Sequence, residues 1–99
     1  MKEVLILEEA VTDLKKSKEF YNRQDPGIGN YFINEILSEI QELESKNGVH
    51  LKQFNYFRKL SKKFPYAIYY YTANEKVFVI AILDLRQNPT DLSNTLSNR

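Results

Sequence analysis

The apolar residues in the first part of the chain predict one short strand followed by a helix. The run EVLIL at residues 3–7 is rich in branched aliphatic side chains, which strands favour. From Glu9 onward the apolar spacing changes to three and four residues, and it places Ala10, Leu14 and Tyr21 on one stripe. This change of period predicts that the chain passes directly from a strand into an amphipathic helix.

Asp25-Pro26 separates this helix from a second one. A residue before proline disfavours the helical conformation, so the first helix is expected to end there. Residues 30–48 resume the helical spacing, and Gly48 suits the left-handed position that closes a helix. The apolar stripe of this second helix is predicted to consist of Phe32 or Ile33, Ile36, Leu37, Ile40 and Leu43. A connection this short predicts an antiparallel helical hairpin.

The rest of the chain up to residue 85 has the composition of strands. Residues 55–62, 65–72 and 75–85 are dense in aromatic and β-branched side chains. The first of these segments is half polar, as edge strands often are. A turn at Ala73-Asn74 separates the other two, and connections of this length predict an antiparallel meander.

The most apolar segment fixes the predicted order of the strands. Residues 77–83 are apolar on both faces, which predicts a central strand. The strand at residues 3–7 is the only element left to pair with its free side. The sequence therefore predicts an α+β fold in the order β-α-α-β-β-β, with the helical hairpin packed on one face of a four-stranded antiparallel sheet of order 1-4-3-2. The chain is expected to be one domain, 1–99, with residues 90–99 as a flexible tail.

Both faces of the two central strands are apolar, although the helical hairpin can cover only one. An apolar sheet face left uncovered in a small protein usually marks a site for a partner. The alternative is that the C-terminal tail or the curl of the sheet covers this face.

Composition excludes several kinds of chemistry. The chain has no cysteine, so disulfides and thiolate catalysis are excluded, and its single histidine, His50, excludes a site of several histidines. We expect no metal and no cofactor. The apolar segments are too short for a membrane span, and the N-terminal one is too short for a signal peptide, so a cytoplasmic location is expected.

Charge is distributed unevenly, although the net charge is only +1. Residues 1–44 hold ten acidic and five basic residues, residues 75–99 hold three of each, and residues 45–74 hold no acidic residue. The six basic residues of this basic window are Lys46, Lys52, Arg58, Lys59, Lys62 and Lys63. Such a window is either a surface that attracts anions or a solvated hairpin that keeps an edge strand soluble.

The most apolar strand ends in charged residues, in the sequence AILDLRQNP at residues 81–89. At strand spacing Asp84 and Arg86 point to the same side. They form either a simple ion pair, worth about 0 to 1 kcal/mol if exposed, or a functional site.

Three segments of the chain together resemble the RelE/ParE superfamily, the toxins of type II toxin–antitoxin modules. They are EEAVTDL at residues 8–14, FRKLSKKFPYAIYYY at residues 57–71 and VFVIAILDLRQNP at residues 77–89. The resemblance implies the fold predicted above and an antitoxin as partner. It implies functional roles for Arg86 at the end of the last strand and for Arg58 in the second strand. Members often carry a histidine and a second arginine where this chain has Asp84 and Gln87.

The resemblance, the basic window and the apolar sheet face together give the residues expected at each site. The residues expected to contact the cellular target are Arg58, Lys59, Lys62, Lys63, Asp84 and Arg86. The residues expected to contact the antitoxin are Tyr69, Tyr70, Tyr71 and Phe78. A homodimer is a further possible assembly.

Two activities divide the superfamily, and they require different residues. ParE-like members poison DNA gyrase, whereas RelE-like members cut messenger RNA on the ribosome. RNA cleavage needs cations and a general acid–base. The candidates here are Arg58, Arg86, Lys62, Lys63, His50 and Tyr66. The C-terminal segment lacks the Tyr or His that RelE-like members commonly use.

The predicted strand register also bears on this choice. It pairs Arg58 with about Tyr69 and Tyr66 with about Ile82, and this places Arg58 and Arg86 roughly 13 Å apart along the strands, plus two strand spacings. The low net charge is unusual for a protein that docks on ribosomal RNA. These observations favour gyrase as the target, with an mRNA endonuclease or an inactive binding module as alternatives.

Overall fold

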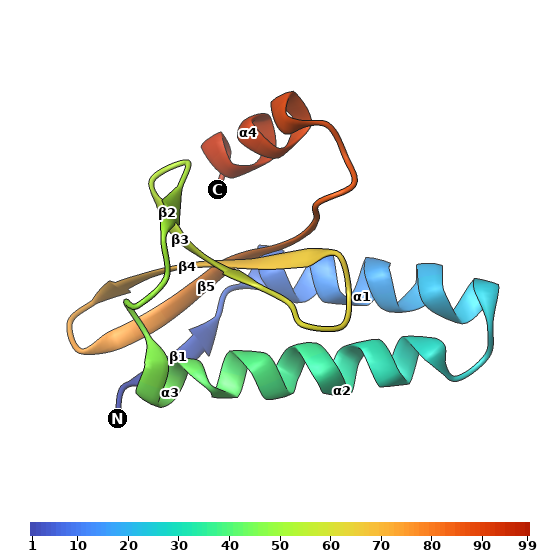
Figure 1. The fold of residues 1–99 in the computed structure, drawn as a ribbon, viewed down its shortest axis with the longest axis horizontal. Helices are drawn as coiled ribbons and strands as arrows, with labels where there is room; N and C mark the ends of the chain where they lie inside the picture. The colour runs from blue at the N-terminus through green and yellow to red at the C-terminus, as the bar shows by residue number, and fades with distance from the viewer.

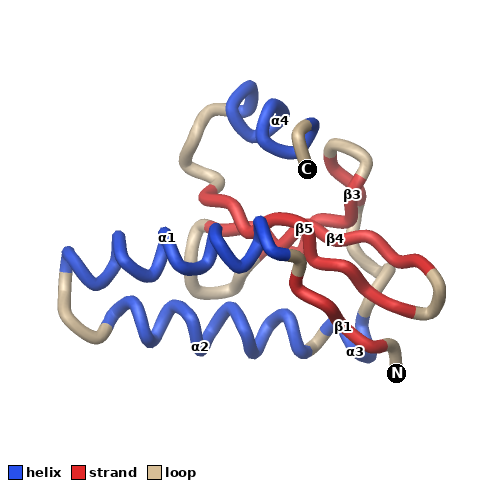
Figure 2. The backbone as a smooth tube through the Cα atoms, turned by 180° about the vertical axis from the view of Figure 1, so that it is seen from behind, coloured by secondary structure: helices blue, strands red, loops and turns tan.

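The computed structural model describes residues 1–99 as a sheet with a helical hairpin on one face and a short C-terminal helix on the other (Figure 1). The elements are β1 (Glu3–Ile6), α1 (Glu8–Gln24), α2 (Ile28–Gln41), α3 (Leu43–Lys46), β2 (Lys52–Gln53), β3 (Tyr56–Leu60), β4 (Tyr66–Ala73), β5 (Lys76–Asp84) and α4 (Pro89–Ser97). The view from behind shows the same three layers, with α4 lying across the sheet from α1 and α2 (Figure 2). No helix combines the length and the apolar character that a membrane span requires.

The sheet has the order β1-β5-β4-β3-β2, so β5 is internal as predicted. Two details of the prediction are wrong. The sheet has five strands, because the two-residue β2 pairs with β3, and it is mixed, because β1 runs parallel to β5. The parallel pairing places the start of α1 beside the middle of β5, where the Leu7 N–H donates to the Val79 carbonyl. From there α1 continues along β5 without a reversal of the chain.

The strand register agrees with the prediction for β3 and differs from it for β5. Arg58 pairs with Tyr69, as predicted. The β4–β5 turn, however, lies at Asn74 and Glu75, which have φ angles of 53° and 61°. With a register shift between Tyr69 and Tyr70, this turn moves the pairing of β4 with the far end of β5 by two residues from the prediction.

The helical hairpin packs on the sheet through the predicted stripes. The buried residues of α1 are Ala10, Leu14 and Tyr21, as predicted. In the second helical segment Phe32, Ile36, Ile40 and Leu43 are buried, whereas Leu37 is 40 % exposed and was wrongly placed in the stripe. The Gly48 φ of 79° confirms the left-handed residue expected after this segment.

The prediction that residues 90–99 form a flexible tail is wrong. Pro89–Ser97 is helix α4, whose first turn is capped by the Asn88 side chain, which accepts a hydrogen bond from the Asp91 N–H at 2.9 Å. Leu92 and Leu96 are buried on the sheet face opposite the hairpin. The C-terminal segment therefore covers part of the apolar face. This coverage is the alternative to an open site for a partner that the sequence allowed.

The last residue fastens α4 to the rest of the domain. Both terminal nitrogens of Arg99 donate to the Asp13 carboxylate, at 2.7 and 2.8 Å, and one also donates to the Ile80 carbonyl. Asp13 also accepts the Ile82 N–H at 3.0 Å. This ion pair joins α1, the end of α4 and the backbone of β5. The β5 residues involved lie just after the part of the strand that pairs with β1.

Candidate functional site

The candidate functional site lies where β5 ends, and its central residue is Arg86. The guanidinium donates to both oxygens of the Asp84 carboxylate, from Nε at 3.0 Å and from Nη2 at 2.7 Å. The Arg86 N–H also donates to Asp84, at 2.8 Å. These hydrogen bonds lower the pKa of Asp84 and raise that of Arg86, so both groups stay charged. The pair is the ion pair that the sequence suggested, and the Arg86 side chain remains 54 % exposed.

Tyrosines of the hairpin and the sheet line the inner side of this site. Arg86 Nη2 lies 3.4 Å from the Tyr21 hydroxyl on α1. The Tyr66 hydroxyl on β4 donates to Ser17 at 3.0 Å. Burial raises the pKa of Tyr66, and this outweighs the effect of the hydrogen bond to Ser17. A hydroxyl held protonated in this way is a poor general base.

Aromatic rings extend the site toward the tip of the helical hairpin. The Phe64 ring lies between those of Tyr21 and Tyr31, with centroids 5.3 and 5.7 Å away. Lys63 Nζ lies 5.6 Å from the centre of the Tyr31 ring and 3.6 Å from Glu35. Tyr31 and Glu35 both raise the pKa of Lys63. The result is an aromatic surface with a cation at each side, Arg86 and Lys63. We call it the Arg86 surface.

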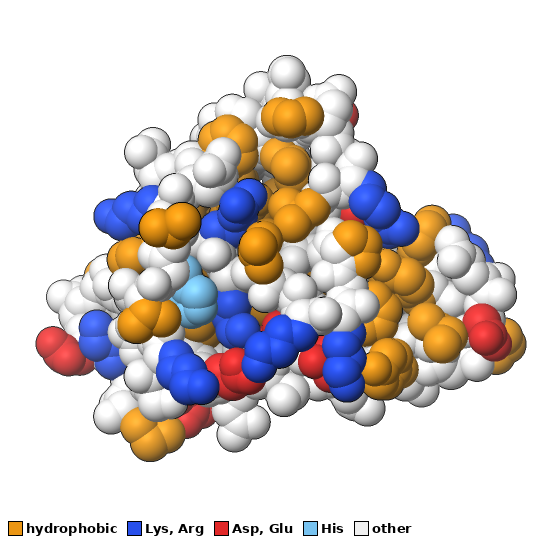
Figure 3. All heavy atoms as spheres, in the orientation of Figure 1, with side chains coloured by type: hydrophobic (Ala, Val, Ile, Leu, Met, Phe, Trp, Pro, Cys, Tyr) orange, Lys and Arg blue, Asp and Glu red, His pale blue; other side chains and the backbone are white.

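Most of the other predicted cations are neutralised by α2. Lys59 lies 3.6 Å from Glu39 and 3.4 Å from Glu42, and Lys62 also contacts Glu42, at 3.4 Å. Glu39 is only 2 % exposed and also accepts hydrogen bonds from Ser61 and the Lys62 N–H. Figure 3 shows the resulting row of alternating blue and red side chains along the lower edge of the molecule. On this side the basic window is a network of ion pairs and not an open positive surface.

Arg58 does not join Arg86. It pairs with Tyr69 and so lies on the α4 face, whereas Arg86 bonds to Tyr21 of the hairpin on the other face. In strand register Arg58 is level with Ala81, five residues before Arg86. The two arginines therefore cannot clamp one phosphate in this structure.

His50 lies at the opposite edge of the sheet from β1, just before β2. Its Nδ1 is 2.5 Å from the Tyr70 hydroxyl, which also accepts the Gly48 N–H at 2.8 Å. Since the hydroxyl accepts from Gly48, its own hydrogen is directed to a neutral His50. Burial lowers the pKa of His50, and the charge of Lys59 adds to this while Glu42 opposes it. The residue ties the loop after α3 to the core and is remote from Arg86.

The four residues predicted to contact an antitoxin differ in accessibility. Tyr69 and Tyr70 are fully buried, so neither ring is offered on the surface of this structure. Tyr71 and Phe78 are half-buried and stacked, with ring centres 5.0 Å apart. No three His, Cys, Asp or Glu side chains lie close enough together to hold a metal ion.

Sequence reasoning missed two residues that shape these sites. Glu39 occupies the apolar stripe of α2, three residues after Ile36, and a carboxylate in such a position is a signal of a buried ion pair. Tyr21 was predicted only as a core residue. Its contact with Arg86 joins positions 65 residues apart, which no local pattern records.

Protonation of His50 is expected to weaken the fold. The unfolded chain has the ordinary His value of 6.5, and the folded pKa is lower. Stability should therefore be constant above about pH 6.5 and fall as the pH drops through the folded pKa, because the unfolded state binds the proton first. Urea unfolding at pH 7.5 and 5.5 measures this. His50→Gln should show a smaller difference between the two pH values, and an equal difference would contradict the role assigned to His50.

The fold is shared with a solved chain of a bacterial ParDE system. A chain of the "Chromosomal ParDE TA system from P. aeruginosa" superposes with a TM-score of 0.79, covering 87 % of this chain and 98 % of that chain. The two sequences are 12 % identical, so the likeness is one of fold. No protein-family model and no curated protein matches the sequence. The fold implied by the resemblance to the RelE/ParE superfamily is thereby confirmed.

Proposed function

We propose that the protein is the toxin of a type II toxin–antitoxin module and that a cognate antitoxin neutralises it. The observation that carries the proposal is the shared fold with a chain of a ParDE system, over nearly the whole of both chains. A second, independent support is the resemblance of three sequence segments, which together cover most of the central strands β4 and β5.

The target we propose is DNA gyrase, which the Arg86 surface contacts. Poisoning of gyrase requires a binding surface, and this surface combines an exposed guanidinium with aromatic rings and a second cation. Exposed Arg and aromatic side chains are the usual anchors of protein interfaces.

The placement of the ribonuclease candidates supports this choice. Arg58, His50 and Arg86 lie on different faces or edges of the sheet, and Lys62 is paired with Glu42. Tyr66, the one candidate acid–base beside Arg86, is buried and bonded to Ser17. Acid–base catalysis requires its groups within hydrogen-bond reach of one substrate.

Induced expression of the chain in a gyrase-sensitive bacterium tests the proposal. We expect loss of colony formation, with filamentous cells and DNA breaks, and rescue by co-expression of the product of the adjacent reading frame. Rapid arrest of translation with cut messages would instead indicate the endonuclease. Normal growth at high expression would support an inactive binding module and refute the toxin assignment.

A further inference from the structure

Two neighbouring basic residues of β3 lie on opposite faces of the sheet, and only one of them has an acidic partner. Lys59 pairs with Ile68 in register and points to the hairpin face, where it meets Glu39 of α2 and Glu42, the residue just after α2. Arg58 is the neighbouring residue in the strand and so points to the α4 face. It has no carboxylate within 4 Å, and no residue from 45 to 74 is acidic. Arg58 is therefore a half-buried cation without a counter-ion.

A second unpaired group lies beside it. Tyr69 is the cross-strand partner of Arg58 and is fully buried, and its hydroxyl is the one buried side-chain polar atom without a hydrogen-bond partner. Burial raises the pKa of Tyr69, and the charge and the hydrogen-bonding nitrogens of Arg58, which lie near the hydroxyl, offset part of the rise. An unpaired buried hydroxyl is costly, and an oxygen acceptor placed between the two residues would satisfy both.

Apolar side chains surround this pair. Tyr56 and Leu60 lie two residues to either side of Arg58 on β3, and the Leu51 carbonyl accepts the Arg58 N–H, so Leu51 lies opposite. Leu51 is 86 % exposed and Leu60 52 % exposed. In Figure 3 hydrophobic side chains gather in this region, between α4 at the top and the row of ion pairs below.

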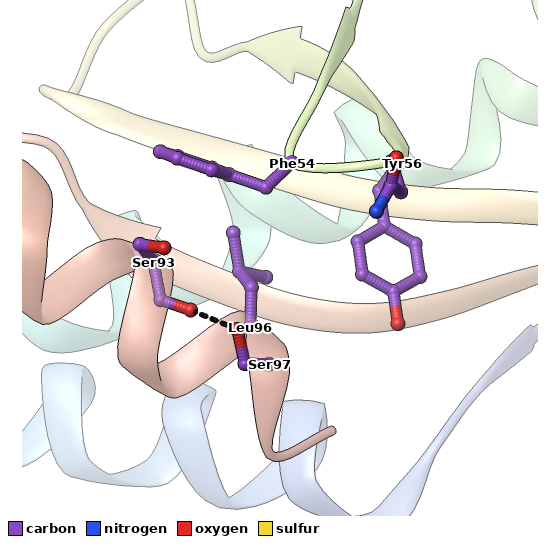
Figure 4. A pocket seen from close by; sticks show the side chains of 6 residues that line it. Phe54, Tyr56, Ser93, Leu96 and Ser97 are labelled. Atoms are coloured by element: carbon purple, nitrogen blue, oxygen red, sulfur yellow. Dashed lines mark hydrogen bonds between the residues drawn. The ribbon is translucent and has the colours of Figure 1, made fainter.

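A pocket of about 370 Å³ continues the surface from Tyr56 to α4. It is lined by Phe54, Asn55, Tyr56, Ser93, Leu96 and Ser97. Figure 4 shows the Phe54 and Tyr56 side chains at the turn between β2 and β3, and Leu96 reaching toward them from α4. Phe54 has a φ of 55°, a strained conformation for a bulky residue. Its ring is packed against the apolar cluster that includes Leu92 and Leu96 of α4. The pocket is thus a pre-formed hollow whose apolar walls are Phe54, Tyr56 and Leu96, and Tyr56 lies two residues from Arg58 on β3.

We propose that the α4 face binds a segment of the antitoxin that carries a carboxylate flanked by apolar side chains. The carboxylate accepts hydrogen bonds from Arg58 and Tyr69, and a neighbouring apolar side chain fills the pocket beside Tyr56. This proposal rests on the proposed function, since it describes where the antitoxin binds. Charge complementarity selects the occupant, because this part of the chain has cations but no acids, and the two exposed leucines suit a protein segment better than a nucleic acid.

The test measures binding of the purified adjacent gene product to variants of the whole chain by calorimetry. Arg58→Ala should weaken binding by about 100-fold, since charged hydrogen bonds buried in an interface are strong. Tyr69→Phe should weaken it by about 5- to 10-fold, as for one hydrogen bond, while leaving the free protein as stable as before or more so. Weaker binding together with unchanged or higher stability of the free protein would separate a binding role of Tyr69 from a structural one.

Lys52→Ala is the matched control, because it removes the same charge from the adjacent strand, where Lys52 lies over the Phe57 ring. Its binding should change by less than about twofold, as expected for a charge at the rim of an interface. If the wild-type chain does not bind the adjacent gene product, the proposed function fails. If the wild-type chain binds and Arg58→Ala and Tyr69→Phe bind as tightly as it does, the proposed carboxylate site is refuted while the proposed function stands. Binding of a single-stranded RNA oligonucleotide that depends on Arg58 would also overturn the proposal.

Discussion

Replacing Arg86 with alanine is expected to abolish growth inhibition while the fold stays intact. The guanidinium is half exposed, and its ion pair with Asp84 is a surface contact. Such pairs contribute about 0 to 1 kcal/mol, so the free energy of unfolding should change by no more than about 1 kcal/mol. Binding can depend far more strongly on the same residue, because truncation of an arginine anchor often costs 2 kcal/mol or more, about 30-fold in affinity. Colony counts after induction and urea unfolding of the purified variant measure the two effects.

Arg23→Ala is the control for this variant. Arg23 is also exposed and ion-paired, with Glu19 at 3.8 Å, but neither residue contacts Arg86 or the aromatic residues of the Arg86 surface. It should keep full growth inhibition. If Arg86→Ala unfolds, Arg86 is a structural residue, and if the variant still inhibits growth, the Arg86 surface is not the target site.

Replacing Glu39 with alanine is expected to destabilise the protein by about 3 to 5 kcal/mol, the usual cost of removing one partner from a buried ion pair. The change leaves the Lys59 ammonium, which is 8 % exposed, with Glu42 alone. It also removes the acceptor for Ser61 and for the Lys62 N–H, at 2.7 and 3.1 Å. A loss of this size is a large part of the stability of a small domain. Thermal and urea unfolding measure it.

The double variant Glu39→Leu with Lys59→Met shows whether the loss comes from the unpaired charge of Lys59 or from the change in side-chain packing. It removes both charges together and should recover most of the loss, because an apolar pair of similar volume often replaces a buried ion pair without cost. Glu35→Ala is the exposed comparison, since its partner Lys63 is 55 % exposed, and it should cost less than about 1 kcal/mol. A loss for Glu39→Ala no larger than that for Glu35→Ala would contradict the buried network.

Periodicity alone predicted β1, α1, α2 and the three longer strands β3, β4 and β5, and its limits are physical. The helical stripes and the central β5 follow from apolar residues that must face a core. The direction of β1 does not, because an apolar strand of four residues looks the same whether it pairs in parallel or antiparallel. Helix α4 had a readable signal, since Asn88 and Pro89 form a capped start and Leu92 and Leu96 are four residues apart. The polar residues between the leucines concealed it.

The candidate site was predicted only in part, for a similar reason. Asp84 and Arg86 are two residues apart in the sequence, so their pairing needs only local backbone geometry, here a turn in which the Arg86 N–H donates to Asp84. The pairing of the basic window depends instead on tertiary structure, because Lys59, Lys62 and Lys63 meet acidic residues in or just after α2 that lie 17 or more residues earlier in the chain. Of the two neighbouring basic residues on β3, Lys59 is ion-paired and Arg58 is not, because they lie on opposite sides of the sheet.

Purified gyrase provides the most direct test of the central claim. The wild-type chain should inhibit supercoiling of relaxed plasmid and trap the cleaved DNA complex, Arg86→Ala should do neither, and the wild-type chain should leave messages intact in a translating extract. Cleavage of ribosome-bound message by the wild-type chain, with gyrase unaffected, would contradict the account.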